Sequence, residues 1–195
     1  MQDDPLSSSP SAMAGVTATD TPPLVVALIG LPGAGKSVVA AALAHEFGLQ
    51  RVCRDELRRA MFPQCSYSYA EKRAAFRALL LAVEVNCALG RGSVIDGVTF
   101  SRRADLERLD ATLKPYRVRP LALFLDCPPE ICRERVARDV ATGRHLAVDR
   151  SPQLVDEIMA RFDPPPASCE RIVAGGSESE MVDAAVAAVR ARVAG

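Results

Sequence analysis

The 195-residue chain has no excess charge of either sign and no long hydrophobic run. Its 24 basic residues balance its 24 acidic ones, which argues against a broad nucleic-acid-binding surface but leaves room for a small nucleic-acid substrate held by a few arginines. No apolar run approaches the ~20 residues that cross a bilayer, and the acidic, Ser- and Pro-rich first residues differ from a secretory signal. We therefore expect a cytoplasmic protein without membrane association.

The cysteines form no recognisable metal-binding or disulfide framework. They are scattered along the chain without a C-x-x-C pair, at Cys53, Cys65, Cys87, Cys127, Cys132 and Cys169. This pattern favours buried free thiols in a reducing compartment over a metal site or disulfides.

What the chain does contain is a glycine-rich phosphate-binding motif. An apolar run over residues 24–29 leads into the pattern G-x-x-x-x-G-K-S at residues 30–37, and helical periodicity follows. The glycines let backbone N–H groups turn toward phosphate oxygens, and the helix N-terminus adds its positive dipole. We predict that Lys36 reaches the β- and γ-phosphates of ATP and that Ser37 ligates Mg²⁺. The predicted ATP-binding residues of this segment are Gly30, Leu31, Pro32, Gly33, Ala34, Gly35, Lys36, Ser37 and Val38.

Other nucleotide-binding classes lack their signatures in this chain. The glycine spacing does not fit the G-x-G-x-x-G of dinucleotide folds. A GTPase would carry an N-K-x-D motif, which is missing, and an oligomeric ATPase would carry a strand ending in Asp-Glu, which Leu125-Asp126-Cys127 does not match.

Strand-like and helix-like segments alternate from residue 24 onward, which predicts an α/β fold. The expected strands are 24–29, 49–53, 93–96, 121–126 and 171–173, and the expected helices are 36–47, 55–61, 70–89, 102–113, 130–139, 152–162 and 177–193. We expect the three-layer P-loop NTPase fold, with a five-stranded parallel sheet, helices on both faces and a lid over about residues 133–150. Residues 1–23 are predicted to be a disordered tail, and residues 24–195 a single domain.

Three acids are expected near one cleft, because parallel strands all end at the same edge of a sheet. These are Asp55, Asp96 and Asp126, each at or just after the end of a strand. Asp96 could hold Mg²⁺ or bind an acceptor, although its Asp-Gly pair also fits a plain turn. Thr99 could add a hydrogen bond to an acceptor or cap the next helix.

Asp55 and Arg58 lie three residues apart on a predicted helix and therefore share a face. The carboxylate could accept the proton of an attacking hydroxyl, and the guanidinium could hold an anionic part of the acceptor. The alternative is a helix cap with an ordinary salt bridge. The position after a strand that neighbours a phosphate loop favours the functional interpretation.

Several arginines on and after the helix at 130–139 could neutralise a phosphoryl group in transfer. They are Arg133, Arg135 and Arg138, with Arg144 in the loop beyond. The alternative is a charged helix face paired with neighbouring acids. We predict that Arg138 or Arg135 is catalytic and that Arg144 contacts ATP.

Together these stretches resemble a P-loop kinase family of small AAA-type ATP-binding kinases. Its branches include phage-type polynucleotide 5′-kinase, zeta toxins, chloramphenicol phosphotransferase, adenylylsulfate kinase and gluconate kinase. The likeness covers about residues 24–165 and rests on the phosphate loop, residues 53–58, residues 94–96, and residues 125–130 with the arginines that follow. The resemblance implies that Asp55 is the general base, that Arg58 binds acceptor phosphate, and that a lid arginine stabilises the transferring phosphate.

The sequence thus predicts an ATP- and Mg²⁺-dependent phosphotransferase acting on a hydroxyl, with a small molecule favoured as acceptor. A polynucleotide 5′-hydroxyl or a nucleotide sugar is the alternative acceptor, and an ATP-dependent switch or binding module is the alternative class. The predicted substrate-binding residues are Asp55, Arg58, Asp96 and Thr99, and the predicted metal ligands are Ser37 and Asp96. The identity of the acceptor and the oligomeric state are left open.

Overall fold

The computed structural model describes residues 22–143 and 151–194. Its strands are β1 (Val25–Ile29), β2 (Gln50–Cys53), β3 (Ser93–Asp96), β4 (Leu121–Asp126) and β5 (Glu170–Val173). Its helices are α1 (Lys36–Phe47), α2 (Arg54–Met61), α3 (Tyr69–Ala88), α4 (Arg103–Leu113), α5 (Pro129–Thr142), α6 (Pro152–Met159) and α7 (Glu178–Ala194), with a 3₁₀ helix, η1 (Lys114–Tyr116), before β4. Residues 1–21 of the expected tail and residues 144–150 of the expected lid lie outside the described residues.

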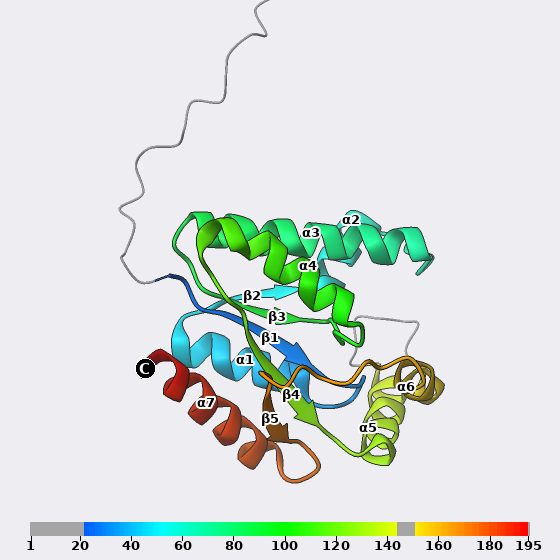
Figure 1. Cartoon of the computed structure of the whole chain (residues 1–195). Helices are drawn as coiled ribbons and strands as arrows, with labels where there is room; N and C mark the ends of the chain where they lie inside the picture. The colour runs from blue at the N-terminus through cyan, green and yellow to red at the C-terminus, as the bar shows by residue number, and fades with distance from the viewer. Residues whose placement is uncertain (1–21, 144–150, 195) are drawn as a thin grey trace, which may run out of the picture.

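The five strands form one parallel sheet in the order β2-β3-β1-β4-β5. Val26 of β1 lies beside Val94 of β3 and Leu121 of β4, so β1 is the central strand. The predicted fold class is confirmed. Because the strands are parallel, their carboxyl ends share one edge, on the side of the molecule where α5 and α6 lie (Figure 1).

Alternate side chains of β1 enter two separate hydrophobic cores. Val26 and Leu28 pack with α1, α5 and α7, whereas Val25, Ala27 and Ile29 pack with α3 and α4. Figure 1 shows the resulting three layers, with α2, α3 and α4 on one side of the sheet and α1 and α7 on the other. All five side chains are fully or almost fully buried, and each larger one contributes about 1.5–3 kcal/mol through burial.

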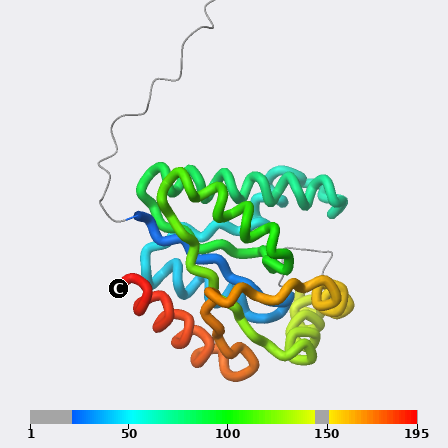
Figure 2. The backbone as a smooth tube through the Cα atoms, in the orientation of Figure 1, coloured from blue at the N-terminus to red at the C-terminus, as the bar shows by residue number. Residues whose placement is uncertain are grey.

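Helices α1 and α7 lie side by side although they come from opposite ends of the chain (Figure 2). Arg190 of α7 forms an ion pair with Glu46 of α1 across this contact. Near the start of α7, the side chain of Met181 lies against Gly35 of the phosphate loop that precedes α1.

Most element limits agree with the sequence to within one residue, and two helices differ. Helix α5 runs to Thr142 because nothing before Gly143, which adopts φ +60°, interrupts it. Helix α6 ends at Met159, earlier than expected. Beyond it the backbone N–H of Asp163 donates to the carbonyl of Ser101 at 2.8 Å, and the Asp163 carboxylate accepts from the N–H of Arg103 at 2.8 Å. These two bonds draw the chain toward the start of α4 instead of continuing the helix.

Candidate active site

The phosphate loop between β1 and α1 has a shape that requires glycine at Gly33 and Gly35. These residues adopt φ +84° and +96°, in the left-handed region. A Cβ on Gly33 would lie 2.4 Å from the carbonyl oxygen of Cys132, and one on Gly35 would lie 2.6 Å from Cε of Met181. At Gly33 the backbone of α5 therefore leaves no space for a side chain, whereas at Gly35 the tip of the Met181 side chain would have to move.

Lys36 closes this loop from its C-terminal end. Its side chain is buried, and its ammonium group donates to the carbonyls of Gly30 and Leu31 at 2.9 and 2.7 Å. The positive charge is thus held across the loop, where the backbone N–H groups of a phosphate loop converge.

Ser37, the next residue, contacts the end of β3. Its hydroxyl donates to Oδ1 of Asp96 at 3.0 Å. Asp96 is 1 % exposed, and its Oδ1 also accepts the N–H of Gly97 at 2.7 Å. Two oxygen groups predicted as Mg²⁺ ligands are therefore in direct contact.

Arg51 of β2 is the cation that compensates the buried Asp96, and the sequence reasoning missed it. Its Nε and Nη2 donate to Oδ2 of Asp96 at 3.0 and 2.8 Å, and its Nη1 lies 3.3 Å from Glu56. Burial lowers the pKa of Arg51, but the hydrogen bonds and charge of Asp96 outweigh it, so that the net shift is upward. The signal in the sequence was that Arg51 is a charged residue within a short strand. This strand, β2, lies beside β3, which ends in the buried Asp96.

Asp55 and Arg58 share a buried face of α2, as their spacing predicted. Asp55 is 8 % and Arg58 3 % exposed, and Nη2 of Arg58 donates to Oδ1 of Asp55 at 3.0 Å. Nε of Arg54 lies 3.9 Å from the same oxygen. The guanidinium of Arg58 also stacks over the ring of Tyr67, 4.5 Å from its centroid. The pair is therefore a buried ion pair and not an exposed one, and its role in catalysis stays a prediction.

Gly97 brings the ends of β2 and β3 together. It adopts φ +73°, and a Cβ there would lie 3.2 Å from the backbone nitrogens of both Arg54 and Asp55. A side chain would push the start of α2 away from β3. The close approach places the buried carboxylates of Asp55 and Asp96 on the same side of one cleft.

Arg135 and Arg138 of α5 have different surroundings. Nη1 of Arg135 donates to the carbonyl of Ala174 at 3.2 Å and lies 3.5 Å from that of Gly33, while its Nη2 lies 3.5 Å from the carbonyl of Gly176. Arg138 is exposed and lines the cleft, and its guanidinium has no partner among residues 22–143 and 151–194. Arg144 lies outside the described residues.

One cleft of about 1200 Å³ joins these groups. Its walls include the phosphate loop, α2, α3, the segment after β3, and α5 with α6. The predicted site residues that line it are Pro32, Gly33, Gly35, Lys36, Ser37, Val38, Asp55, Arg58, Asp96, Thr99, Arg135 and Arg138. Gly30, Leu31 and Ala34 do not line it, since Ala34 is fully buried and Leu31 packs against the core beneath the loop. The carbonyl of Thr99 accepts the N–H of Gly30 at 3.1 Å and joins the loop to the segment after β3.

The expectation that Asp126 joins Asp55 and Asp96 near one cleft is wrong. Asp126 does not line the cleft and instead pairs with Arg171 of β5 at its outer side, with Nε donating at 2.9 Å. The cause is the strand order, because β4 lies on the opposite side of β1 from β2 and β3. Residues at the same edge of the sheet therefore do not all line the same cleft.

Within the described ranges, no group of three His, Cys, Asp or Glu side chains is arranged to hold a metal ion. In the same ranges no helix has the length and apolar character to cross a bilayer. The six cysteines are free thiols; four are buried, as predicted, whereas Cys65 and Cys169 are half-buried. Burial raises the pKa of Cys132 to about 12. The cytoplasmic location and the division into tail and single domain stay predictions.

The five-stranded sheet and the phosphate loop at the end of its central strand define a P-loop domain. A family model named AAA_33, described as an AAA domain, matches residues 25–165. The chain therefore belongs to this family. A comparison with curated protein sequences finds no match.

Solved structures of small P-loop kinases share the fold. A protein of Chloroflexus aurantiacus J-10-fl, classed provisionally as a kinase, has a TM-score of 0.70 and 19% identity, over 88% of this chain and 98% of that one. A gluconokinase of Sinorhizobium meliloti 1021 has a TM-score of 0.62 and 19% identity, over 88% and 93%. An APS kinase of Mycobacterium tuberculosis, solved with AMPPNP and APS, has a TM-score of 0.62 and 17% identity, over 86% and 96%. At these identities the likeness establishes the fold.

Proposed function

We propose that this chain is an ATP-dependent phosphotransferase that moves the γ-phosphoryl group to a hydroxyl of an acceptor. The observation that carries the proposal is the presence, in one cleft, of a phosphate loop with Lys36 and of the buried carboxylate of Asp55. A phosphate loop alone also serves switches and motors. A buried carboxylate facing the same cleft provides the proton acceptor that a hydroxyl nucleophile needs. The gluconokinase and APS kinase among the structural neighbours agree with this proposal.

The nucleotide would be bound by the phosphate loop and the start of α1. Backbone N–H groups of residues 33–38 would bind phosphate oxygens, and Lys36 would exchange its two carbonyl partners for the β- and γ-phosphates. Arg135 contacts the loop and residues 174–176 at once, so we assign it to holding the nucleotide site together rather than to a moving lid.

The residues present fit a magnesium ion that is held largely by the nucleotide. Mg²⁺ usually takes one or two protein oxygens together with phosphates and water, and Ser37 and Asp96 offer hydroxyl and carboxylate oxygens 3.0 Å apart. These two residues would hold it. When bound, the ion would neutralise phosphate charge.

The acceptor would be bound by α2 and by arginines that line the cleft. Asp55 would accept the hydroxyl proton as the oxygen attacks, and Arg58 would orient Asp55 through their hydrogen bond and hold the acceptor. Arg138, which has no partner within the described residues, would be free to approach the transferring group. Thr99 would add a hydrogen bond to the acceptor.

The test is γ-phosphoryl transfer from labelled Mg-ATP to a 5′-hydroxyl oligonucleotide and to a fractionated metabolite pool. Wild type is compared with Asp55→Asn and with Asp110→Asn, which alters an exposed acid of α4 outside the cleft. We expect labelled product from wild type and Asp110→Asn, and a loss of roughly 10²- to 10⁴-fold in Asp55→Asn with ATP binding retained. ATP binding without transfer to any fraction, with equal slow hydrolysis by all three proteins, would favour the switch or binding module.

A further inference from the structure

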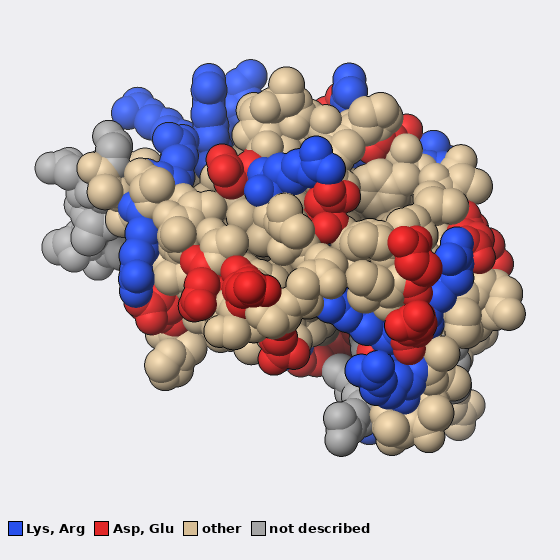
Figure 3. Space-filling model, turned by 90° about the horizontal axis from the view of Figure 1, so that it is seen from below, with Lys and Arg blue, Asp and Glu red and all other residues tan. Residues whose placement is uncertain are grey.

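The cleft carries a positive charge that the balanced composition of the chain conceals. Among residues 22–143 and 151–194, eleven Lys and Arg residues line it, against five Asp and Glu, whereas the whole chain has 24 of each sign. On the face seen from below, by contrast, acidic and basic side chains lie side by side (Figure 3). The positive charge is therefore concentrated where substrates would bind, and a concave wall of one sign concentrates its field inside the cleft.

Part of this charge comes from α3, a different element from the phosphate loop. Helix α3 presents one face to the cleft, with residues spaced at one helical turn. That face consists of Tyr69, Lys72, Arg73, Phe76, Arg77 and Leu80. Phe76 also packs on Phe100 beneath the cleft floor, with ring centroids 6.4 Å apart. The side of α3 that lines the cleft thus carries arginines together with a buried aromatic contact.

Some arginines of the cleft are already neutralised and others are not. Arg58 pairs with Asp55 at 3.0 Å, and Arg108 pairs with Asp105 at 3.2 Å. Arg73, by contrast, has no acidic partner among the described residues: it donates to the hydroxyl of Tyr69 at 3.2 Å and lies over the ring of the same residue, 5.6 Å from its centroid. Arg77 has no acidic partner in the part of the chain that the structure describes, residues 22–143 and 151–194.

Two guanidinium groups one turn apart repel each other unless an anion lies between them. Arg73 and Arg77 keep this arrangement on the wall of a substrate-sized cleft. Guanidinium groups bind phosphate oxygens through paired N–H donors. A neutral sugar or alcohol would gain little from such a wall.

We propose that the acceptor itself carries a phosphate group, which Arg73 and Arg77 bind while its hydroxyl lies at Asp55. This inference rests on the proposed function and names the class of its substrate. In the transfer, the acceptor oxygen forms a bond to the γ-phosphorus, the bond from that phosphorus to the bridging oxygen of ADP breaks, and the hydroxyl proton passes to Asp55. The phosphate group of the acceptor, bound by Arg73 and Arg77, takes no part in the bond changes and anchors the acceptor. The phosphate could belong to a phosphorylated metabolite or to the backbone of an oligonucleotide.

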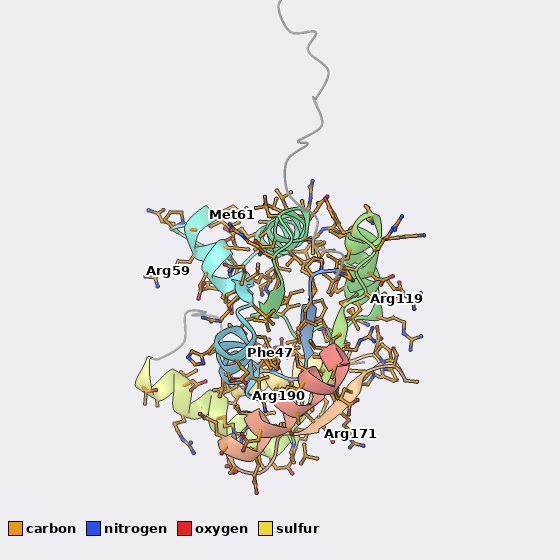
Figure 4. The ribbon with its side chains drawn as sticks, turned by 90° about the vertical axis from the view of Figure 1, so that its left-hand side faces the viewer. Phe47, Arg59, Met61, Arg119, Arg171 and Arg190 are labelled. Atoms are coloured by element: carbon orange, nitrogen blue, oxygen red, sulfur yellow. The ribbon has the colours of Figure 1, made fainter. Side chains whose placement is uncertain are left out.

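The test uses acceptor pairs that differ only in one phosphate group: adenosine with adenosine 3′-monophosphate, and glucose with glucose 6-phosphate. A 5′-hydroxyl trinucleotide represents the oligonucleotide source. Each compound is assayed with wild type, with Arg73→Gln/Arg77→Gln, and with Arg119→Gln as a matched control. Arg119 is an exposed arginine outside the cleft and lies at the periphery of the view in Figure 4.

We expect wild type and Arg119→Gln to show a kcat/KM at least ten times higher for the phosphorylated member of one pair, or for the trinucleotide over adenosine. In the double variant this preference should fall roughly 10- to 100-fold through KM, with activity on the unphosphorylated compound unchanged. A preference confined to the trinucleotide would identify the oligonucleotide as the source. Equal kcat/KM within every pair, or an unaltered preference in the double variant, would overturn the inference while the phosphotransferase proposal stands.

A binding measurement keeps the inference separate from catalysis. Labelled adenosine 3′-monophosphate, glucose 6-phosphate and trinucleotide are dialysed against each protein saturated with Mg-AMPPNP, which occupies the phosphate loop. Binding of any of them that is lost in Arg73→Gln/Arg77→Gln supports the arginine site even if no transfer occurs. Binding of none, or equal binding by both proteins, contradicts it. Thermal unfolding checks that the double variant is folded.

Discussion

Arg51 and Asp96 form a two-point contact that joins neighbouring strands at the floor of the cleft. Nε and Nη2 of Arg51 donate to Oδ2 of Asp96 at 3.0 and 2.8 Å, and the other carboxylate oxygen faces Ser37 at 3.0 Å. The arginine therefore fixes which oxygen of Asp96 points at the phosphate loop. Hydrogen bonds to charged groups contribute about 1.5–3 kcal/mol, but the side chain of Arg51 is 35% exposed, so the low end of that range applies.

Replacing Arg51 by Met should lower the free energy of unfolding by about 1.5 kcal/mol, since Asp96 would lose its cation. The same change in an Asp96→Asn background should cost much less. Urea denaturation of the four proteins of this double-mutant cycle measures the difference. Arg91→Met, at an exposed arginine outside the cleft, is the control. An equal cost of Arg51→Met in both backgrounds would contradict the coupling.

Alanine at Gly33 should damage the phosphate loop far more than alanine at Gly48. Both glycines adopt positive φ, +84° and +63°, so both substitutions cost about 1–2 kcal/mol in backbone strain. Only at Gly33 would the new Cβ meet a backbone atom, the carbonyl oxygen of Cys132 at 2.4 Å, whereas nothing lies within 4 Å at Gly48. We expect Gly33→Ala to abolish ATP-analogue binding and Gly48→Ala to retain it, as measured by calorimetry. Retained binding in Gly33→Ala would contradict this prediction, because the loop would then have moved to accommodate the new Cβ.

Arg135 and Arg138 should respond differently to substitution by Gln. Arg135 holds carbonyls of the loop and of residues 174–176. Its loss should therefore lower both the melting temperature and the affinity for ATP. Arg138 has no partner within the described residues, so its loss should leave the melting temperature unchanged and lower kcat roughly 10- to 100-fold if it approaches the transferring group. Steady-state kinetics and thermal unfolding separate the two, and a reversal of these patterns would exchange their assignments.

Glu71 should stabilise the loop before α3 in a manner that depends on pH. Its carboxylate accepts the backbone N–H of Ser66 at 3.2 Å and that of Ser68 at 3.1 Å, and these bonds with the Ser66 hydroxyl lower its pKa from the ordinary 4.5 to about 2. A lowered pKa means that the stabilisation is complete above about pH 4.5 and is lost as the pH falls from there to about 2. Glu71→Gln should therefore lower the melting temperature at pH 7, and its difference from wild type should shrink by pH 3.

The control for Glu71 is Glu107→Gln, at an exposed glutamate of α4. It should lie close to wild type at both pH values. The same loop carries Tyr67, which stacks on Arg58. We therefore also expect Glu71→Gln to raise KM for the acceptor and to leave KM for ATP unchanged. A difference in melting temperature that is constant with pH would contradict the assigned role.

Local patterns in the sequence predicted the elements and the phosphate loop. Strands Ser93–Asp96 and Leu121–Asp126 were placed to the residue, because apolar runs bounded by charged or turn-forming residues are local signals. The shared helix face of Asp55 and Arg58 followed from helical spacing alone. Two helix ends differed from the prediction. Helix α5 continues to Thr142, just before Gly143, and the end of α6 depends on contacts between Asp163 and the start of α4.

The sequence by itself determined a P-loop domain of parallel α/β type, since its motif and its alternation of elements are properties of neighbouring residues. Which distant side chains meet was decided by the tertiary structure. The strand order separates Asp126 from Asp96, and it places Arg51 beside Asp96. The packing of α5 on the loop distinguishes Arg135 from Arg138, and the position of α3 gives the cleft a charge that a net composition of zero does not reveal. Contacts between residues far apart in the chain depend on strand order and helix packing, and no local pattern encodes them.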